Sequence, residues 1–132
     1  RFNLAYVNIG ASCDVGASWA LPRLVGLRRA LEIAMLGDAL DAAAAERMGL
    51  INRVVPAAEL ESEAMAFAQR LAAGPTVALG NLRRLMRGSF DRELGAQLDA
   101  ESAAFRNCAA TDDFKIGIDA FFARKTAAFT GR

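Results

Sequence analysis

The sequence contains no histidine and only two cysteines in 132 residues. Without histidine, the chain cannot supply a Ser-His-Asp or Cys-His nucleophilic site, and it lacks the commonest ligand of transition metals. Cys13 and Cys108 are too few for a dense disulfide framework, and no Cys-x-x-Cys spacing indicates zinc binding or thioredoxin-like redox chemistry. Any proton transfer by this chain must therefore use a carboxylate. No metal site is expected, and the expected location is the reducing cytoplasm.

Long hydrophobic runs and an excess of one charge are also absent. The longest uncharged stretches, Phe2–Cys13 and Leu71–Leu82, fall well short of the roughly 18 apolar residues that a membrane span needs. The 16 basic and 15 acidic side chains nearly cancel, and the four arginines between positions 83 and 92 form no platform with interleaved aromatic residues. These arginines predict a solvated helix face, so neither a membrane nor a nucleic acid is an expected partner.

The sequence does have enough apolar material for a folded core. Hydrophobic residues make up 54% of the chain and charged residues 23%, which offsets the entropy lost on folding and excludes disorder as the main state. The length suits one ordinary globular domain. The chain starts at Arg1 with neither a methionine nor a signal peptide, so we expect a fragment of a longer polypeptide.

Residues 1–56 predict a mixture of strands and helices. Phe2–Ile9 has the character of a strand, and a short helix is expected around Trp19 and Leu21. Apolar residues spaced by three and four from Leu27 predict an amphipathic helix that stops at Gly37.

Another short helix and a second strand are expected before Pro56. Asp41 is placed to cap the helix, which should end near Gly49. The β-branched run Leu50–Val55 then predicts the strand. Residues 57–132, by contrast, predict four helices over about 60–71, 76–87, 94–108 and 111–121, with Gly74 and Pro75 separating the first two.

Three blocks of this sequence resemble the enoyl-CoA hydratase/isomerase (crotonase) family. The first is the loop segment Ile9–Gly26, which ends in Leu-Pro-Arg-Leu-Val-Gly, and the second is Gly49–Val55, which reads Gly-Leu-Ile-Asn-Arg-Val-Val. The third is the ending Phe121–Arg132, whose last four residues are Phe-Thr-Gly-Arg. The resemblance covers essentially the whole chain and is specific for the superfamily. It says little about the substrate, because acyl-chain preference depends on pocket shape.

The resemblance implies an α/β fold that is mostly helical in this chain. Residues 1–56 would be the end of a crotonase-like ββα spiral, and residues 57–132 a helical trimerisation region that gives a homotrimer or hexamer. The full domain of the family is about twice as long. By resemblance, the other half carries the two backbone N–H groups of the oxyanion hole and most of the coenzyme A pocket. This chain by itself should then lack the largest catalytic contribution and be inactive.

The resemblance also implies which residues carry chemistry. Family members place carboxylates at the positions of Tyr6 and Asp14, and a tyrosine at the first disfavours addition of water to a double bond. Asp14 matches the aspartate of isomerase-like branches, which takes a proton from a carbon activated by the thioester and returns it elsewhere. Asp14 could equally be an Asx-type turn residue. Tyr6 would line the substrate pocket or simply bury its ring.

Five more residues are candidates for contact with the substrate, and most of them also have a structural interpretation. Trp19 and Leu21 would contact substrate and surround Asp14 with apolar groups, although core packing is favoured for Trp19. Arg124 and Lys125 would bind coenzyme A phosphates, or else form the solvated end of a helix. Phe121 would cover the adenine or pantetheine, although core packing is again favoured.

The leading hypothesis is therefore part of an acyl-CoA isomerase that moves a double bond or proton next to a coenzyme A thioester, as in the degradation of fatty or aromatic acids. Coenzyme A belongs to the substrate, so no separate cofactor is expected. Two alternatives remain open: a non-catalytic helical assembly module derived from a crotonase, and an enoyl-CoA hydratase.

Overall fold

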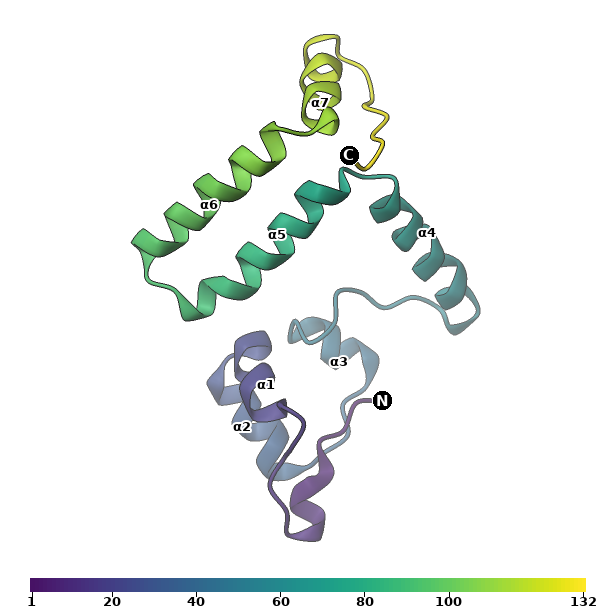
Figure 1. Ribbon diagram of the computed structural model, residues 1–132. Helices are drawn as coiled ribbons and strands as arrows, with labels where there is room; N and C mark the ends of the chain where they lie inside the picture. Colours follow the sequence, from purple (N-terminus) through teal and green to yellow (C-terminus); the bar gives the residue numbers. More distant parts are fainter. The chain divides into compact units, whose positions relative to one another are not determined.

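Seven α-helices and three short 3-10 helices make up the regular structure in a computed structural model that describes all residues from 1 to 132 (Figure 1). The chain divides into two compact units, Arg1–Ala57 and Ala58–Arg132, which are described separately.

The first unit is built from one 3-10 helix and three α-helices. The predicted helices around Trp19 and from Leu27 are both confirmed, and the second ends at Gly37, which has the left-handed φ of +66°. A Cβ atom at Gly37 would lie 2.9 Å from Val7 Cγ1, so both the backbone conformation and the packing require glycine there. The elements are η1 (Ala5–Ile9), α1 (Ala17–Val25), α2 (Leu27–Leu36) and α3 (Ala42–Arg47).

The cap predicted for the third α-helix is also present. Asp41 has an extended backbone, and its Oδ1 accepts a hydrogen bond of 2.7 Å from the backbone N–H of Ala44. This bond satisfies one of the N–H groups that a helix start leaves without a partner.

The two predicted strands are wrong. Phe2 and Leu40 exchange two backbone hydrogen bonds of 2.8 and 2.9 Å as an isolated antiparallel bridge, and the chain then turns into η1. At the second site, the N–H of Val54 donates to the Glu46 side chain instead of to a neighbouring strand. A strand is held by hydrogen bonds to a partner strand, and a pair of this size is too small to persist as a sheet.

A small apolar cluster holds the first unit together. Val25, Ala30 and Ile33 are buried where α1 meets α2. Partly buried side chains from the bridge, α1 and the segment after α3 pack against this cluster: Leu4, Leu21, Leu40, Met48 and Leu50.

The second unit is helical throughout, and its four predicted helices are confirmed. Helices α5 and α6 lie side by side in Figure 1 and contact each other. Contacts also join α6 to α7 and α4 to α5. Its elements are η2 (Ala57–Glu59, at the junction of the units), α4 (Leu60–Ala72), α5 (Thr76–Gly88), η3 (Ser89–Asp91), α6 (Leu94–Ala109) and α7 (Asp112–Phe122).

Polar contacts fix α5 against α6. Asn81 is buried in α5, and its Nδ2 donates to the backbone oxygen of Ala104 and to Asn107 Oδ1 on α6, at 3.3 and 2.9 Å. Because a buried amide without partners is costly, these bonds hold the two helices in one register.

The last residues of the chain fold back onto the start of α7. Thr111 caps this helix as predicted, accepting a bond of 3.2 Å from the N–H of Phe114. One residue into the helix, the carboxylate of Asp113 is only 2% exposed and accepts hydrogen bonds from the backbone N–H groups of Thr130 and Gly131. The carboxylate therefore anchors the C-terminal segment on α7.

No helix of this chain combines the length and the apolar character that crossing a membrane requires.

Candidate active site around Asp14

Two backbone turns bring the loop before α1 back toward η1. At the end of η1, Gly10 adopts the left-handed φ of +72°. The N–H of Gly10 then bonds to the carbonyl of Val7, and the N–H of Ala11 bonds to that of Tyr6, both at 3.0 Å. These bonds close the helix end and reverse the direction of the chain.

The second turn runs from Asp14 to Ala17. The N–H of Ala17 donates to the carbonyl of Asp14 at 2.9 Å, while Val15 and Gly16 between them have φ values of +45° and +81°. Positive φ at both central positions belongs to turns that favour glycine, asparagine and aspartate, and a β-branched residue is disfavoured there. Val15 is 93% exposed, so no side-chain packing compensates for this strain.

Together the two turns place Asp14 against Tyr6, although eight positions separate them. The Tyr6 hydroxyl donates a hydrogen bond to Asp14 Oδ1. This hydrogen bond raises the pKa of Tyr6 above its ordinary value of 10.0, and smaller increases come from desolvation and from the charges of Asp14 and Cys13. Tyr6 is therefore a neutral hydrogen-bond donor at neutral pH.

The surroundings of Asp14 differ from the sequence expectation. Trp19 and Leu21 were expected to enclose its carboxylate, but the Asp14 side chain is exposed and its hydrogen-bond partner is the Tyr6 hydroxyl. The reason is geometric: Asp14 precedes the first turn of α1, while both apolar side chains lie further along the helix. Tyr6 is partly buried and does not line the apolar cavity of the first unit.

Core packing, the interpretation favoured for Trp19, is wrong for this chain. Its ring is 53% exposed, and the guanidinium of Arg23 lies 4.0 Å from the ring centroid. Arg23 Nη1 also donates to the carbonyl oxygen of Trp19 at 2.8 Å, because residues four apart share one helix face. The indole thus lies on the surface of α1 beneath a cation.

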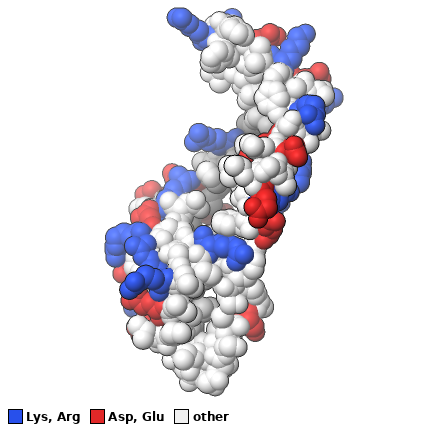
Figure 2. Space-filling model, turned by 90° about the vertical axis from the view of Figure 1, so that its left-hand side faces the viewer, with Lys and Arg blue, Asp and Glu red and all other residues white.

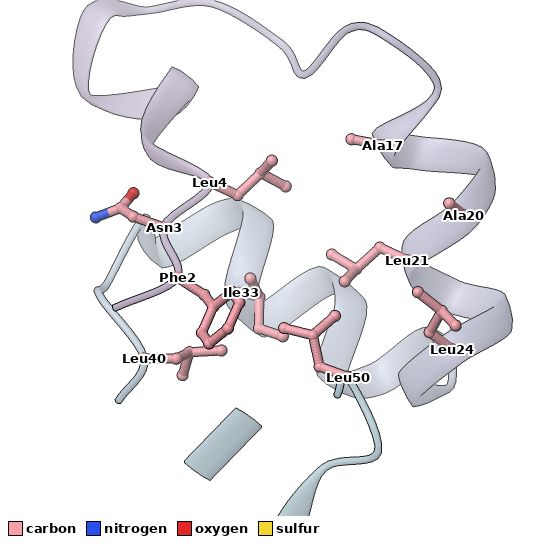
Figure 3. Close-up of a pocket in the computed structure, with 10 residues that line it drawn as sticks. All are labelled: Phe2, Asn3, Leu4, Ala17, Ala20, Leu21, Leu24, Ile33, Leu40 and Leu50. Atoms are coloured by element: carbon pink, nitrogen blue, oxygen red, sulfur yellow. The ribbon is translucent and has the colours of Figure 1, made fainter. Parts of the chain in front are cut away.

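Leu21 lines an apolar cavity of about 200 Å³ in the first unit. Figure 3 shows its side chain on the same cavity as Ile33 of α2 and Leu4. Ala17, three residues after Asp14, lines the same cavity, which therefore begins next to the Asp14 turn.

The residues considered for coenzyme A lie in the second unit, at the end of α7. Phe121 and Phe122 are 76% and 78% exposed and pack edge to face at 5.6 Å, so core packing is wrong for Phe121 as well. Arg124 ends the helix with the left-handed φ of +53°, and the N–H of Lys125 bonds back to the carbonyl of Ala120 at 2.9 Å. Both cationic side chains are exposed.

The sequence analysis missed two features of this site. The Tyr6–Asp14 contact had one available signal, the glycine at position 10 between them, because a left-handed residue allows the chain to double back. The strain at Val15 had none, since valine is not a residue that indicates positive φ. The structure brings together no three His, Cys, Asp or Glu side chains that could hold a metal ion.

Comparison with known proteins assigns this arrangement to a family. The family described as enoyl-CoA hydratase/isomerase matches residues 1–132, the whole chain. The chain belongs to the enoyl-CoA hydratase/isomerase family. It is 34% identical over 132 residues to 1,2-epoxyphenylacetyl-CoA isomerase of Escherichia coli, covering 100% of this chain and 50% of that relative. It is also 30% identical to trans-2-decenoyl-[acyl-carrier-protein] isomerase of Streptococcus mutans, with the same two coverages of 100% and 50%.

Solved structures of the family show the same fold. The crystal structure of an enoyl-CoA hydratase from Polaromonas sp. JS666 superposes with a TM-score of 0.90 at 30% identity, covering 98% of this chain and 50% of that one. The chain spans about half the length of the curated relatives it matches. Its fold is accordingly part of a crotonase-like fold, and the family is that of the enoyl-CoA hydratases and isomerases.

Proposed function

We propose that this chain supplies the proton-transferring carboxylate of an acyl-CoA isomerase, which moves a double bond or a proton next to a coenzyme A thioester. The observation that carries the proposal is Asp14, an exposed carboxylate on the turn before α1 whose Oδ1 is held by Tyr6. A single carboxylate is sufficient for this reaction, because it can take a proton from one carbon and deliver it to another. The likeness to 1,2-epoxyphenylacetyl-CoA isomerase supports the choice of an isomerase.

Hydration is the less favoured chemistry at this site. Adding water to a double bond needs a group that activates the water, and the family resemblance places the second such carboxylate at the position of Tyr6. Tyr6 instead keeps its proton at neutral pH, since its pKa is raised, and it donates that proton in a hydrogen bond to Asp14. It therefore cannot act as a second base.

Each unit, taken by itself, carries groups that suit one part of an acyl-CoA molecule. The cavity lined by Leu21 is apolar and begins beside the Asp14 turn, which suits the acyl group. Trp19, exposed on the following helix, is offered to the same ligand. Arg124 and Lys125 are exposed cations suited to coenzyme A phosphates, and the exposed ring of Phe121 is suited to the adenine or pantetheine.

Activity would require the remainder of the crotonase domain. This chain spans half of its relatives, and by resemblance the donors that polarise the thioester carbonyl lie in the other half. We therefore expect the 132-residue chain alone to show no turnover of enoyl-CoA thioesters. Robust turnover by the purified chain would contradict this expectation. We place the protein in the cytoplasm under the same proposal, in keeping with its two free thiols, Cys13 and Cys108.

Assembly into a trimer or a dimer of trimers belongs to the same proposal. The second unit exposes large apolar side chains on all four helices, among them Met65, Leu82, Leu98, Ile118 and Phe121. Exposed apolar surface of this extent supports the proposed assembly. Figure 2 shows that uncharged residues also cover the lowest end of the molecule, the end at which η1 lies in Figure 1.

The test is Asp14→Asn in the whole protein, including any sequence beyond these 132 residues. The amide keeps the shape of the side chain but cannot accept the proton from substrate, so the rate of double-bond migration should fall by about 100-fold or more. Asp41→Asn is the matched control, because asparagine caps a helix as well as aspartate does and this change should leave the rate unaltered. Wild-type turnover in Asp14→Asn would make Asp14 a turn residue only.

A further inference from the structure

The two oxygens of the Asp14 carboxylate are not equivalent. Oδ1 accepts the hydrogen bond from the Tyr6 hydroxyl, whereas no residue of this chain donates to Oδ2. A hydrogen bond to one oxygen restricts the rotation of a carboxylate about its last bond. The backbone turn and the phenol together then set the orientation of Oδ2.

We propose that Tyr6 is the positioning residue of this active site: its hydroxyl holds Asp14 Oδ1, so that Oδ2 alone exchanges the proton with the substrate. This inference rests on the function proposed for Asp14 and adds a role for the residue at the position of the second family carboxylate. Tyr6 acts through Asp14 and exchanges no proton with the substrate.

Asp14 Oδ2 takes part in both proton transfers of the proposed reaction. In the first step a C–H bond next to the thioester breaks, the O–H bond on Oδ2 forms, and the electron pair spreads toward the thioester carbonyl. In the second step the O–H bond breaks and a C–H bond forms at another carbon, which shifts the double bond and regenerates the carboxylate. Tyr6 keeps its own proton in both steps, because the bond to Asp14 raises its pKa.

A tyrosine is chemically suited to this position beside a base. A second carboxylate there would repel the charge on Asp14, and a phenylalanine would leave Oδ1 without a partner. The phenol is neutral, and it donates a charge-assisted hydrogen bond that becomes stronger whenever Asp14 is charged. The hydroxyl therefore orients Asp14 most firmly in the state that accepts the proton.

The backbone supports the same arrangement independently. The turns at Gly10 and at Val15 are independent of each other, and each contains a residue with a left-handed φ. The first turn directs the chain from Tyr6 toward Asp14, and the second follows Asp14. Val15 has a disfavoured φ there and is 93% exposed in this chain, and backbone strain of this kind clusters at functional sites.

The first experiment titrates Tyr6 in the 132-residue chain by the ultraviolet absorbance of its phenolate. Tyr6 is the only tyrosine, so the signal belongs to this residue alone. We expect titration above the ordinary pKa of 10.0 in the wild type, and at lower pH in Asp14→Asn because the negative charge is gone. Asp41→Asn should titrate as the wild type does. An ordinary pKa in the wild type, or equal shifts in both variants, would overturn the contact.

The second experiment measures turnover in the whole protein, where Tyr6→Phe removes only the hydroxyl. Loss of positioning should lower kcat for isomerisation by about 10-fold to 100-fold with little change in KM. In an Asp14→Asn background, Tyr6→Phe should cause no further loss, because Tyr6 acts through Asp14. A rise in KM alone, an unchanged kcat, or equal losses in both backgrounds would overturn the positioning role.

The two experiments separate this inference from the proposed function. If Asp14→Asn is inactive while Tyr6→Phe is fully active, the positioning role fails and the function stands. If Asp14→Asn is fully active, the proposed function fails, and the positioning role fails with it even where the titration shows the contact. The titration of the wild-type chain needs no tyrosine variant, so misfolding of Tyr6→Phe does not remove that test.

Discussion

Replacing Asp113 by asparagine should release the C-terminal segment from α7. The Asp113 carboxylate is 2% exposed and accepts three hydrogen bonds: from Thr130 N at 2.6 Å, from Thr130 Oγ1 at 3.2 Å and from Gly131 N at 2.9 Å. The two backbone donors bind different carboxylate oxygens. Asparagine retains one acceptor oxygen and turns an NH₂ group toward the other N–H, so two donors meet with no acceptor between them.

The expected loss of stability depends on whether the C-terminal segment stays docked on α7 or is released. A hydrogen bond to a charged group contributes about 1.5–3 kcal/mol, and Asp113→Asn removes one such bond and weakens the other two. Undocking limits the cost, because the released N–H groups then find water. It also gives up the contact of the Phe129 ring at Gly117 and the bond of 3.2 Å from Thr76 Oγ1 to the Gly131 carbonyl. We expect the free energy of unfolding to fall by about 2 kcal/mol.

Urea unfolding and amide hydrogen exchange check this prediction together. The amides of Thr130 and Gly131 should exchange faster in Asp113→Asn, with little change for the amides inside α5. The control is Asp112→Asn, an exposed carboxylate in the same first helical turn, which should cost only the dipole interaction of about 0.3–1 kcal/mol. Equal losses in the two variants, or unchanged exchange at Thr130 and Gly131, would refute the anchoring by Asp113.

Three further predictions concern other parts of the chain. Val15→Asn should raise the free energy of unfolding by about 1 kcal/mol in urea, because asparagine tolerates the left-handed conformation and the exposed valine packs against nothing; a lower stability would contradict the strain. Replacing both Arg124 and Lys125 by alanine should raise KM for the acyl-CoA substrate of the whole protein, make KM less dependent on salt and leave kcat unaltered. An unchanged KM at low salt would mean that both residues are only the solvated end of a helix. The 132-residue chain should self-associate at micromolar concentration, and sedimentation as a stable monomer would count against the proposed assembly.

The pH dependence of stability should also show the Tyr6 contact. The folded chain holds the phenol proton more tightly than the unfolded chain does, because the pKa of Tyr6 is raised above 10.0. This contribution to stability is therefore complete below pH 10.0 and is lost as the pH rises through the raised value. Tyr6→Phe should remove this alkaline loss, as followed by urea unfolding at increasing pH.

The helices were predictable because their signals act over a few residues. Asp41 and Thr111 cap the helices that follow them, and Gly74 with Pro75 separates α4 from α5, each through bonds or backbone limits within one turn. The strands were not predictable in the same way, since Phe2–Ile9 has strand propensity but finds only Leu40 as a partner. Pairing is a property of two segments, and propensity belongs to one.

Which residues are buried was also not predictable from residue type alone. Trp19 and Phe121 belong to residue types that are often buried, yet both lie exposed in this chain. Burial depends on what packs against a helix face and not on the residue type alone. The polar Asn81 and Asp113 are buried instead, each with hydrogen-bond partners from another part of the chain. The local sequence does not predict hydrogen-bond partners that lie far along the chain.

For the proposed active site, the sequence by itself limited the chemistry: without histidine, a proton transfer by this chain would need a carboxylate, and the family resemblance favours Asp14 as that group. Only the tertiary structure decided that Tyr6 donates to one oxygen of Asp14 and leaves the other open. The physical reason is the pair of left-handed turns at Gly10 and Val15, which join residues eight positions apart. One of those turns uses a residue type that local propensity disfavours, so the contact became visible only in the folded chain.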